Sequence, residues 1–231
     1  MRNQIRFRLT NQLTESTGQI VLVFLVPAID RHSDNAVLTP WQVLNPAPNG
    51  GNQPFLFDVQ DLQLAVENQD TLCQSRSVDV HANQLYTVTN NHNQGPVLHL
   101  SRSEVPRKAS QISVRNTTDP PATLRSIWKV GGRPVLVKEG INLGSTNAVE
   151  IIPTLFFIVV QPLGDGSPLR QYSREFPYQP MPQMFKESRA ASYDVPVGQR
   201  EVSVRWIRPG GMSGADVLVF DPPSARPQTF L

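Results

Sequence analysis

Residues able to do acid–base or metal chemistry near neutral pH are few and widely spread in this sequence. The four histidines are His32, His81, His92 and His99. No two of them have the two- or four-residue spacing that would place both imidazoles on one face of a strand or helix for a shared zinc ion. His92 and His99 would meet only across a hairpin. We therefore expect surface or loop histidines, with no metal site and no cofactor.

Nucleophile, calcium and phosphate motifs are also missing. The sequence has no Gly-x-Ser-x-Gly segment, and the single cysteine, Cys73, has no basic partner beside it to activate a thiolate. We expect Cys73 to be buried as a small hydrophobic residue. Residues 164–167 begin like a calcium loop, but residues 168–170 supply no further oxygen ligands. Residues 210–214 lack the lysine of a phosphate loop. The sequence assigns no catalytic residue and predicts that the protein is not an enzyme.

One aromatic stretch has the composition of a binding surface. Four rings are interleaved with prolines and basic residues: Tyr172, Phe176, Tyr178 and Phe185. Such rings and basic side chains are common in protein interfaces and on carbohydrate-binding surfaces. The alternative is that the rings plug the ends of a β-sandwich. Richness in Asn and Gln also fits sugar binding, because an amide both donates and accepts hydrogen bonds, but it fits simple solubility equally well.

The charge distribution argues against a nucleic-acid partner. There are 21 basic and 19 acidic residues, a net charge of +2 without long blocks of one sign. Arg2, Arg6 and Arg8 alternate along the predicted first strand, and a solvated strand face is favoured over a phosphate-binding stripe. No apolar run approaches the ~20 residues that cross a bilayer, and no signal-peptide core is present. We expect a cytoplasmic protein, with unconventional export as the alternative.

Two apolar runs must organise the fold. Residues 19–26 end at Pro27, and residues 155–160 lie between Pro153 and Pro162. Their length and β-branched content favour strands, and the lack of polar alternation indicates that both faces are buried. We expect them to be the two central strands of a β-sandwich.

The rest of the chain reads as short strands separated by turn-forming residues, with scarcely any helical periodicity. The fold class is therefore all-β, an antiparallel β-sandwich. We predict a single domain over residues 1–231. Two similar β lobes packed together would give the same pattern, so a pseudo-repeat of residues 1–105 and 106–231 stays open.

The order of four stretches is similar to that of the rhizosphere-expressed RhiA-like proteins of bacteria. The stretches are residues 5–11, residues 21–27, residues 39–43 with Trp41, and residues 97–106. Residues 172–193 depart from the family pattern. The resemblance implies a soluble, often abundant bacterial β-protein linked to population-regulated or host-associated behaviour. It implies no reaction and supplies no catalytic residues.

These observations favour a non-enzymatic structural or interaction protein. A surface of low charge does little to oppose association, so we expect a homo-oligomer, or a protein partner bound through the loops. The alternative is a lectin-like, carbohydrate-binding module with a glycan partner that uses the aromatic stretch and the amide-rich loops. A pore-forming toxin is a third hypothesis.

Overall fold

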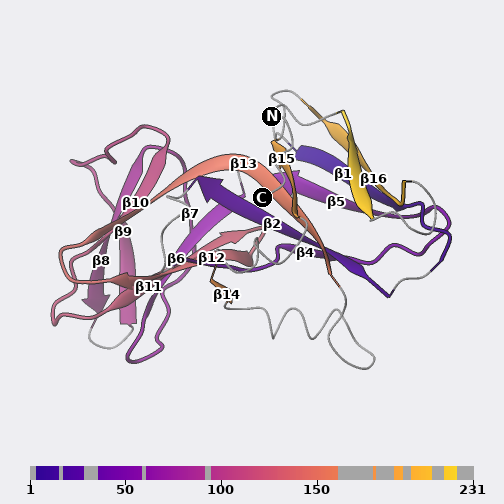
Figure 1. Ribbon diagram of the computed structural model, residues 1–231. Coiled ribbons are helices and arrows are strands. Elements are labelled where there is room, and N and C mark those ends of the chain that lie inside the picture. The colour runs from indigo at the N-terminus through magenta and orange to yellow at the C-terminus, as the bar shows by residue number, and fades with distance from the viewer. Residues whose placement is uncertain are drawn as a thin grey trace.

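The computed structural model describes residues 4–15, 18–28, 36–58, 61–91, 95–160, 179–180, 190–194, 199–209 and 216–222. Every regular element within these ranges is a β-strand, and the strands form three sheets (Figure 1). Strand pairing is antiparallel except between β1 and β16 and between β8 and β10. The predicted all-β, mainly antiparallel architecture is confirmed.

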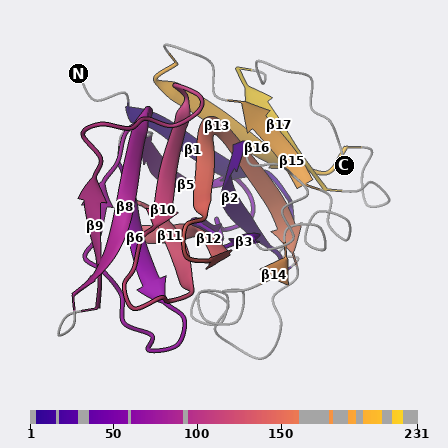
Figure 2. The same cartoon turned by 90° about the vertical axis from the view of Figure 1, so that its left-hand side faces the viewer.

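The three sheets are named here A, B and C. Sheet A has the order β17 (Val217–Asp221), β16 (Glu201–Ile207), β1 (Gln4–Asn11) and β5 (Gly51–Asp58). Sheet B has the order β4 (Gln42–Leu44), β2 (Ile20–Ala28), β13 (Thr146–Val160), β10 (Gln111–Asn116), β8 (Gln84–Asn91) and β9 (Gly95–Leu100), and β15 (Ala190–Asp194) also pairs with β13. Sheet C has the order β14 (Gln179–Pro180), β3 (Ala36–Leu38), β12 (Arg133–Ile141), β11 (Leu124–Val130), β6 (Leu62–Asn68) and β7 (Val78–Asp79). Figure 2 shows β9, β8, β10 and β13 side by side.

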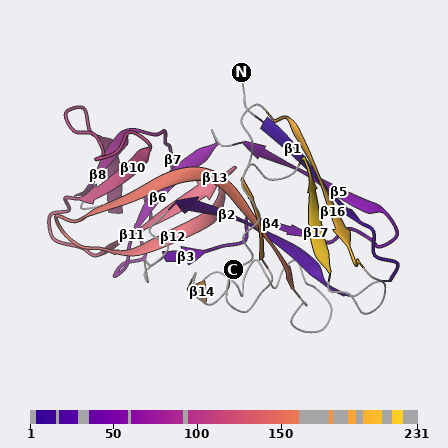
Figure 3. The same cartoon turned by 45° about the horizontal axis from the view of Figure 1, so that its top comes forward.

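The two apolar runs are confirmed as central strands, and they are direct neighbours. β2 and β13 pair antiparallel, with Leu22 opposite Ile158. Residues 20–25 and 155–158 are buried. β13 pairs with β10 over residues 146–150 and with β15 over residues 154–158. Its pairing with β2 has an irregularity in the register between Glu150 and Thr154. Such irregularities bend strands, and β13 is a long curved strand in Figures 1 and 3.

Sheet A packs on sheet B through aromatic rings. The rings of Phe7 and Phe55 stack with centroids 5.0 Å apart. Both lie against Phe157 of β13, at 6.2 and 6.4 Å. Alternate residues of β1 are buried, so Arg6 and Arg8 share the exposed face, as predicted. Arg8 pairs there with Glu201 at 3.5 Å, while Arg2 lies outside the described residues.

Sheet C also packs on sheet B, and a polar bridge crosses their interface. Trp128 of β11 is buried, and its Nε1 donates to Ser126 Oγ at 3.1 Å. Asn147 Nδ2 of β13 donates to the same oxygen at 3.4 Å. Each of the three sheets combines strands from residues 1–105 with strands from residues 106–231. In every sheet, strands from the second half of the sequence therefore join strands from the first half.

Candidate functional site

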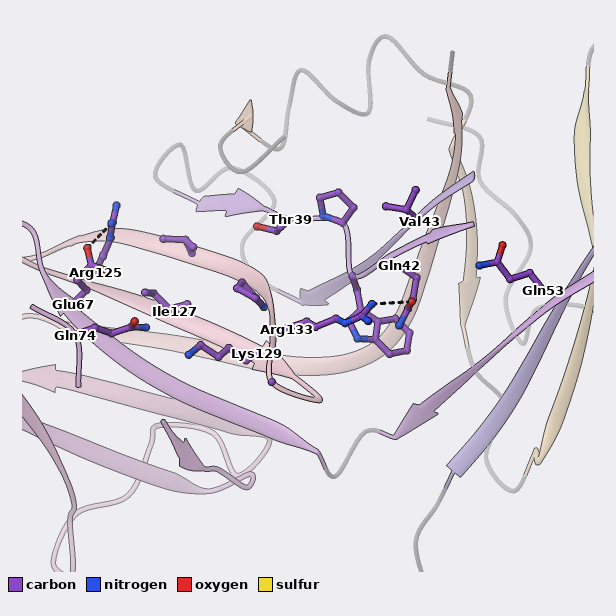
Figure 4. A pocket seen from close by; sticks show the side chains of 15 residues that line it. Thr39, Gln42, Val43, Gln53, Glu67, Gln74, Arg125, Ile127, Lys129 and Arg133 are labelled. Atoms are coloured by element: carbon purple, nitrogen blue, oxygen red, sulfur yellow. Dashed lines mark hydrogen bonds and ion pairs between the residues drawn. The ribbon is translucent and has the colours of Figure 1, made fainter. Parts of the chain in front are cut away.

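A pocket of about 770 Å³ opens on the face of sheet C that points away from Trp128 (Figure 4). This volume lies in the range of sites for small molecules. The residues that line it are Thr39, Pro40, Trp41, Gln42, Val43, Gln53, Glu67, Gln74, Arg125, Ile127, Lys129, Gly132, Arg133, Pro134 and Val137. The pocket thus spans from strands β6, β11 and β12 to the segment that leads into β4 and to β5.

The floor of the pocket is apolar. Successive side chains of a strand point to opposite faces, so Trp128 faces the core and Ile127 faces the pocket. Ile127 is in register with Ala65 of β6 and with Val137 of β12. These three residues form a small apolar cluster of their own, with exposed fractions of 8%, 0% and 5% in that order. Because residues on an outward face are nevertheless buried, the floor is recessed.

One wall is an ion-paired network. Arg125, two positions before Ile127 on the same face, is in register with Glu67 and pairs with its carboxylate. A second carboxylate, Glu139 on β12, lies 3.8 Å from the same guanidinium. The side chains of Arg125 and Glu67 are only 20% and 11% exposed. Fixed between two carboxylates, Arg125 adds rigidity to the wall and little net charge.

Two further basic side chains enter from the hairpin that joins β11 to β12. Lys129 Nζ donates to Ser77 Oγ at 2.9 Å, and Arg133 Nη1 donates to Gln42 Oε1 at 3.2 Å. The second bond ties sheet C to sheet B. The hairpin turns through Gly131 and Gly132 alone, both with positive φ (58° and 77°). Two-residue turns of this kind favour glycine, because side chains are strained there.

The opposite wall is the segment between β3 and β4. Thr39 N donates to Val135 O at 3.1 Å, and Trp41 N donates to Val23 O at 2.8 Å. Backbone hydrogen bonds therefore fix the segment at both ends as it crosses from sheet C to sheet B. Trp41 packs edge-on against two rings of sheet A, with centroids 5.8 Å from Phe55 and 5.4 Å from Phe57. The Trp41 ring thus anchors the wall.

The chemistry that this lining offers is binding chemistry. Among the described residues that line the pocket are three amides, three basic side chains and one carboxylate. The amides can donate and accept hydrogen bonds, and the basic groups can only donate. Throughout the described ranges, no three His, Cys, Asp or Glu residues are grouped so that they could hold a metal ion.

The aromatic stretch proposed from the sequence is described only in part. Tyr172, Phe176, Tyr178 and Phe185 fall outside the described residues, as do residues 164–167 and 210–214. Within the aromatic stretch, Gln179 and Pro180 are described, and they form β14 at the edge of sheet C beside β3. This part of the stretch therefore borders the strand that leads into the wall at Thr39.

The described histidines stand apart from the pocket lining. His81 and His99 are exposed, and His99 Nε2 lies 3.0 Å from Thr89 Oγ1. His32 and His92 lie outside the described residues. These positions agree with the prediction of surface or loop histidines for His81 and His99.

The prediction for Cys73 is wrong. The thiol is exposed rather than buried. Cys73 follows Leu72, which has a positive φ of 57°, and so belongs to the turn after β6 rather than to a strand. A cysteine side chain is often buried, but this turn lies at the protein surface and so exposes the thiol.

The sequence interpretation missed the pocket-lining residues Arg125, Lys129 and Arg133. A usable signal was present. Arg125 and Lys129 are four positions apart in β11, with the apolar Ile127 between them where a solvated face would carry a polar residue. Basic side chains around an outward apolar residue indicate a lined depression on that face.

A scan against family models, a search of curated proteins and a search of solved structures each found no match to this chain. The likeness to RhiA-like proteins therefore stays a prediction. In the described part of the chain there is no helix long and apolar enough to cross a membrane.

Proposed function

We propose that the protein is a non-enzymatic interaction protein that binds a carbohydrate in the pocket on sheet C. The observation that carries the proposal is the lining itself, in which amides and basic groups surround a recessed apolar floor of Ile127 and Val137. Carbohydrate binding is the alternative function considered from the sequence, and we propose it here for the pocket instead of the aromatic stretch. The resemblance to RhiA-like bacterial proteins, which implies no reaction, is compatible with it.

The lining suits a sugar because it offers partners both for the hydroxyl groups and for the apolar ring face of a sugar. A sugar hydroxyl donates one hydrogen bond and accepts others. Gln74 can meet both needs, and Gln42 and Gln53, whose Oε1 atoms accept from Arg133 and Asn45, offer their amide nitrogens. The C–H groups of a pyranose ring are apolar and can lie against Ile127 and Val137. A small number of polar groups over an apolar surface is the usual composition of small-molecule sites.

The carboxylate of the pocket supports a binding role over a hydrolytic one. Glycoside hydrolysis ordinarily needs two carboxyl groups flanking the scissile bond, one to protonate the leaving group and one to attack or to activate water. Among the described lining residues the carboxylate is Glu67, and it is held by Arg125. Glu139 pairs with the same guanidinium. These groups are arranged to neutralise Arg125.

The test is a glycan array followed by isothermal titration calorimetry on the best hit. The double variant Gln42→Ala with Gln74→Ala removes amides from both ends of the pocket. We expect its affinity to fall about tenfold or more, since two hydrogen bonds are lost. The matched control is Gln4→Ala with Gln12→Ala, two exposed positions outside the lining. Binding that both double variants retain equally, or no binding to any glycan, would refute the proposal.

Self-association is the second candidate function, and an edge strand favours it. β5 pairs with β1 on one side, and among the described strands none pairs with its other side. It is eight residues long, and Leu56 on its outer face is 54% exposed. Unpaired edges can accept a strand from a second copy. Light scattering after size exclusion would test this, with Leu56→Lys expected to shift a dimer toward monomer. A monomer at every concentration would rule the dimer out.

A further inference from the structure

The basic groups of the pocket differ in how their charge is used. Arg125 lies between two carboxylates, Glu67 and Glu139. Lys129 and Arg133 contact neutral partners, the Ser77 hydroxyl and the Gln42 amide oxygen. Within the described part of the chain neither has a carboxylate at ion-pair distance. The excess positive charge of the lining therefore resides on Lys129 and Arg133.

We propose that the ligand of this pocket is an acidic oligosaccharide whose carboxylate or sulfate groups pair with Lys129 and Arg133. The inference rests on the proposed function and names the chemical class of its sugar. The present acceptors of these two cations, the serine hydroxyl and the glutamine amide oxygen, are neutral. An anionic acceptor would add the Coulomb attraction of opposite charges to each hydrogen bond.

The two basic groups point toward different ends of the pocket. In Figure 4, Lys129 and Arg133 leave the hairpin in opposite directions, toward Gln74 and toward Gln42. Their present partners lie on different elements, since Ser77 precedes β7 whereas Gln42 belongs to β4. A ligand that satisfies both must carry negative charge at two separated points. An oligosaccharide with acidic groups on more than one unit has that spacing, and a single small carboxylic acid does not.

The rest of the lining favours a sugar over an acidic peptide. The side chains of an acidic peptide present carboxylates, which only accept hydrogen bonds, so only backbone N–H groups of the peptide could donate to an amide oxygen of the lining. A uronic acid or sulfated sugar presents hydroxyls as well as an anion, and so can use both halves of the Gln74 amide, while Gln53, whose Oε1 already accepts from Asn45 N at 2.8 Å, offers its amide nitrogen. The apolar face of the sugar ring can then pack against the floor of Ile127 and Val137.

The experiment compares a galacturonic acid trisaccharide with its fully methyl-esterified form by isothermal titration calorimetry. The two probes have the same sugar backbone, and esterification removes the negative charge. We expect the acid to bind at least about tenfold more tightly than the ester, because each carboxylate adds a Coulomb attraction to the cation that the neutral ester lacks. Raising the salt concentration should weaken binding of the acid and leave that of the ester unchanged.

Substitutions then assign the effect to residues. Lys129→Gln and Arg133→Gln should each weaken binding of the acid about tenfold and change binding of the ester little. Both side chains reach solvent, so thermal unfolding should be nearly unchanged. The matched controls are Lys108→Gln and Arg107→Gln, exposed positions outside the lining that should alter neither affinity.

The outcomes separate the two proposals. Equal binding of acid and ester, lost in the Gln42 and Gln74 double variant, would overturn the acidic class and keep a carbohydrate site. Equal or tighter binding of an oligo-glutamate peptide would overturn the sugar assignment and leave an anion-binding groove. If neither saccharide binds and no other glycan does on an array, the proposed function fails together with this inference.

Discussion

Asn116 is a buried polar residue whose side chain makes four hydrogen bonds. It stands at the end of β10, and its side chain is completely buried. Asn116 Nδ2 donates to Ala122 O and to Ile141 O, both at 2.7 Å. Its Oδ1 accepts from Thr118 N at 3.0 Å and from Thr118 Oγ1 at 2.8 Å. One side chain therefore joins the end of β10 to the segment before β11 and to the end of β12.

Replacing Asn116 by alanine should be costly. Each of the four hydrogen bonds contributes about 1 kcal/mol net, and an unsatisfied buried group costs about 1–3 kcal/mol. We expect Asn116→Ala to lower the free energy of unfolding by about 3–4 kcal/mol. Asn116→Asp keeps the shape but loses both donated bonds and turns an oxygen toward two carbonyl oxygens. It should cost at least as much as alanine.

Urea unfolding followed by tryptophan fluorescence measures both variants, with the slope against urea checked for constancy. Asn142→Ala is the matched control, since Asn142 is exposed in the nearby turn, and we expect a change within about 0.5 kcal/mol. A loss below about 1 kcal/mol for Asn116→Ala, or an aspartate variant as stable as the original, would refute the assigned hydrogen-bond role.

Three further predictions concern the core and its turns. Phe157→Ala empties the ring cluster between sheets A and B and should cost about 3–5 kcal/mol in urea unfolding, whereas Leu56→Ala, on the exposed face of sheet A, should cost less than about 1 kcal/mol. Equal losses would contradict the packing. Burial raises the pKa of Tyr193 in the folded protein. Above a pH of ~10 the unfolded chain therefore loses the phenol proton before the folded protein does, and the free energy of unfolding should fall as the pH rises further. The fall should be less steep in Tyr193→Phe, which has no proton to lose. Identical alkaline slopes would count against it. A Cβ on Gly51 would lie 2.3 Å from Ala47 O, so Gly51→Ala should lose about 2 kcal/mol or more by thermal unfolding, and an unchanged midpoint would show that the turn adapts.

The local patterns of the sequence predicted the strands well. Unbroken apolar runs marked β2 and β13 as strands buried on both faces, and the alternation of residues 5–9 marked the exposed face of β1. Both signals depend on the two-residue period of a strand, which is a local property.

The spacing of Arg125, Ile127 and Lys129 was a local signal, but the partners that complete the site depend on pairing between distant residues. Arg125 meets Glu67 across 58 positions, and Arg133 meets Gln42 across 91. No local pattern selects those partners, since register and strand order are set by the whole sheet. The role of Asn116 was missed for the same reason, because its side chain bonds to the carbonyl groups of Ala122 and Ile141, which belong to two other segments.

The central claim is that the pocket on sheet C is where this protein binds its partner, and the most direct test is an amide NMR titration with the galacturonic acid trisaccharide. We expect the largest shift changes in residues that line the pocket, above all Ile127, Gly132 and Gln42. Saturable shifts confined to the outer face of sheet A, with these three amides unmoved, would contradict the claim.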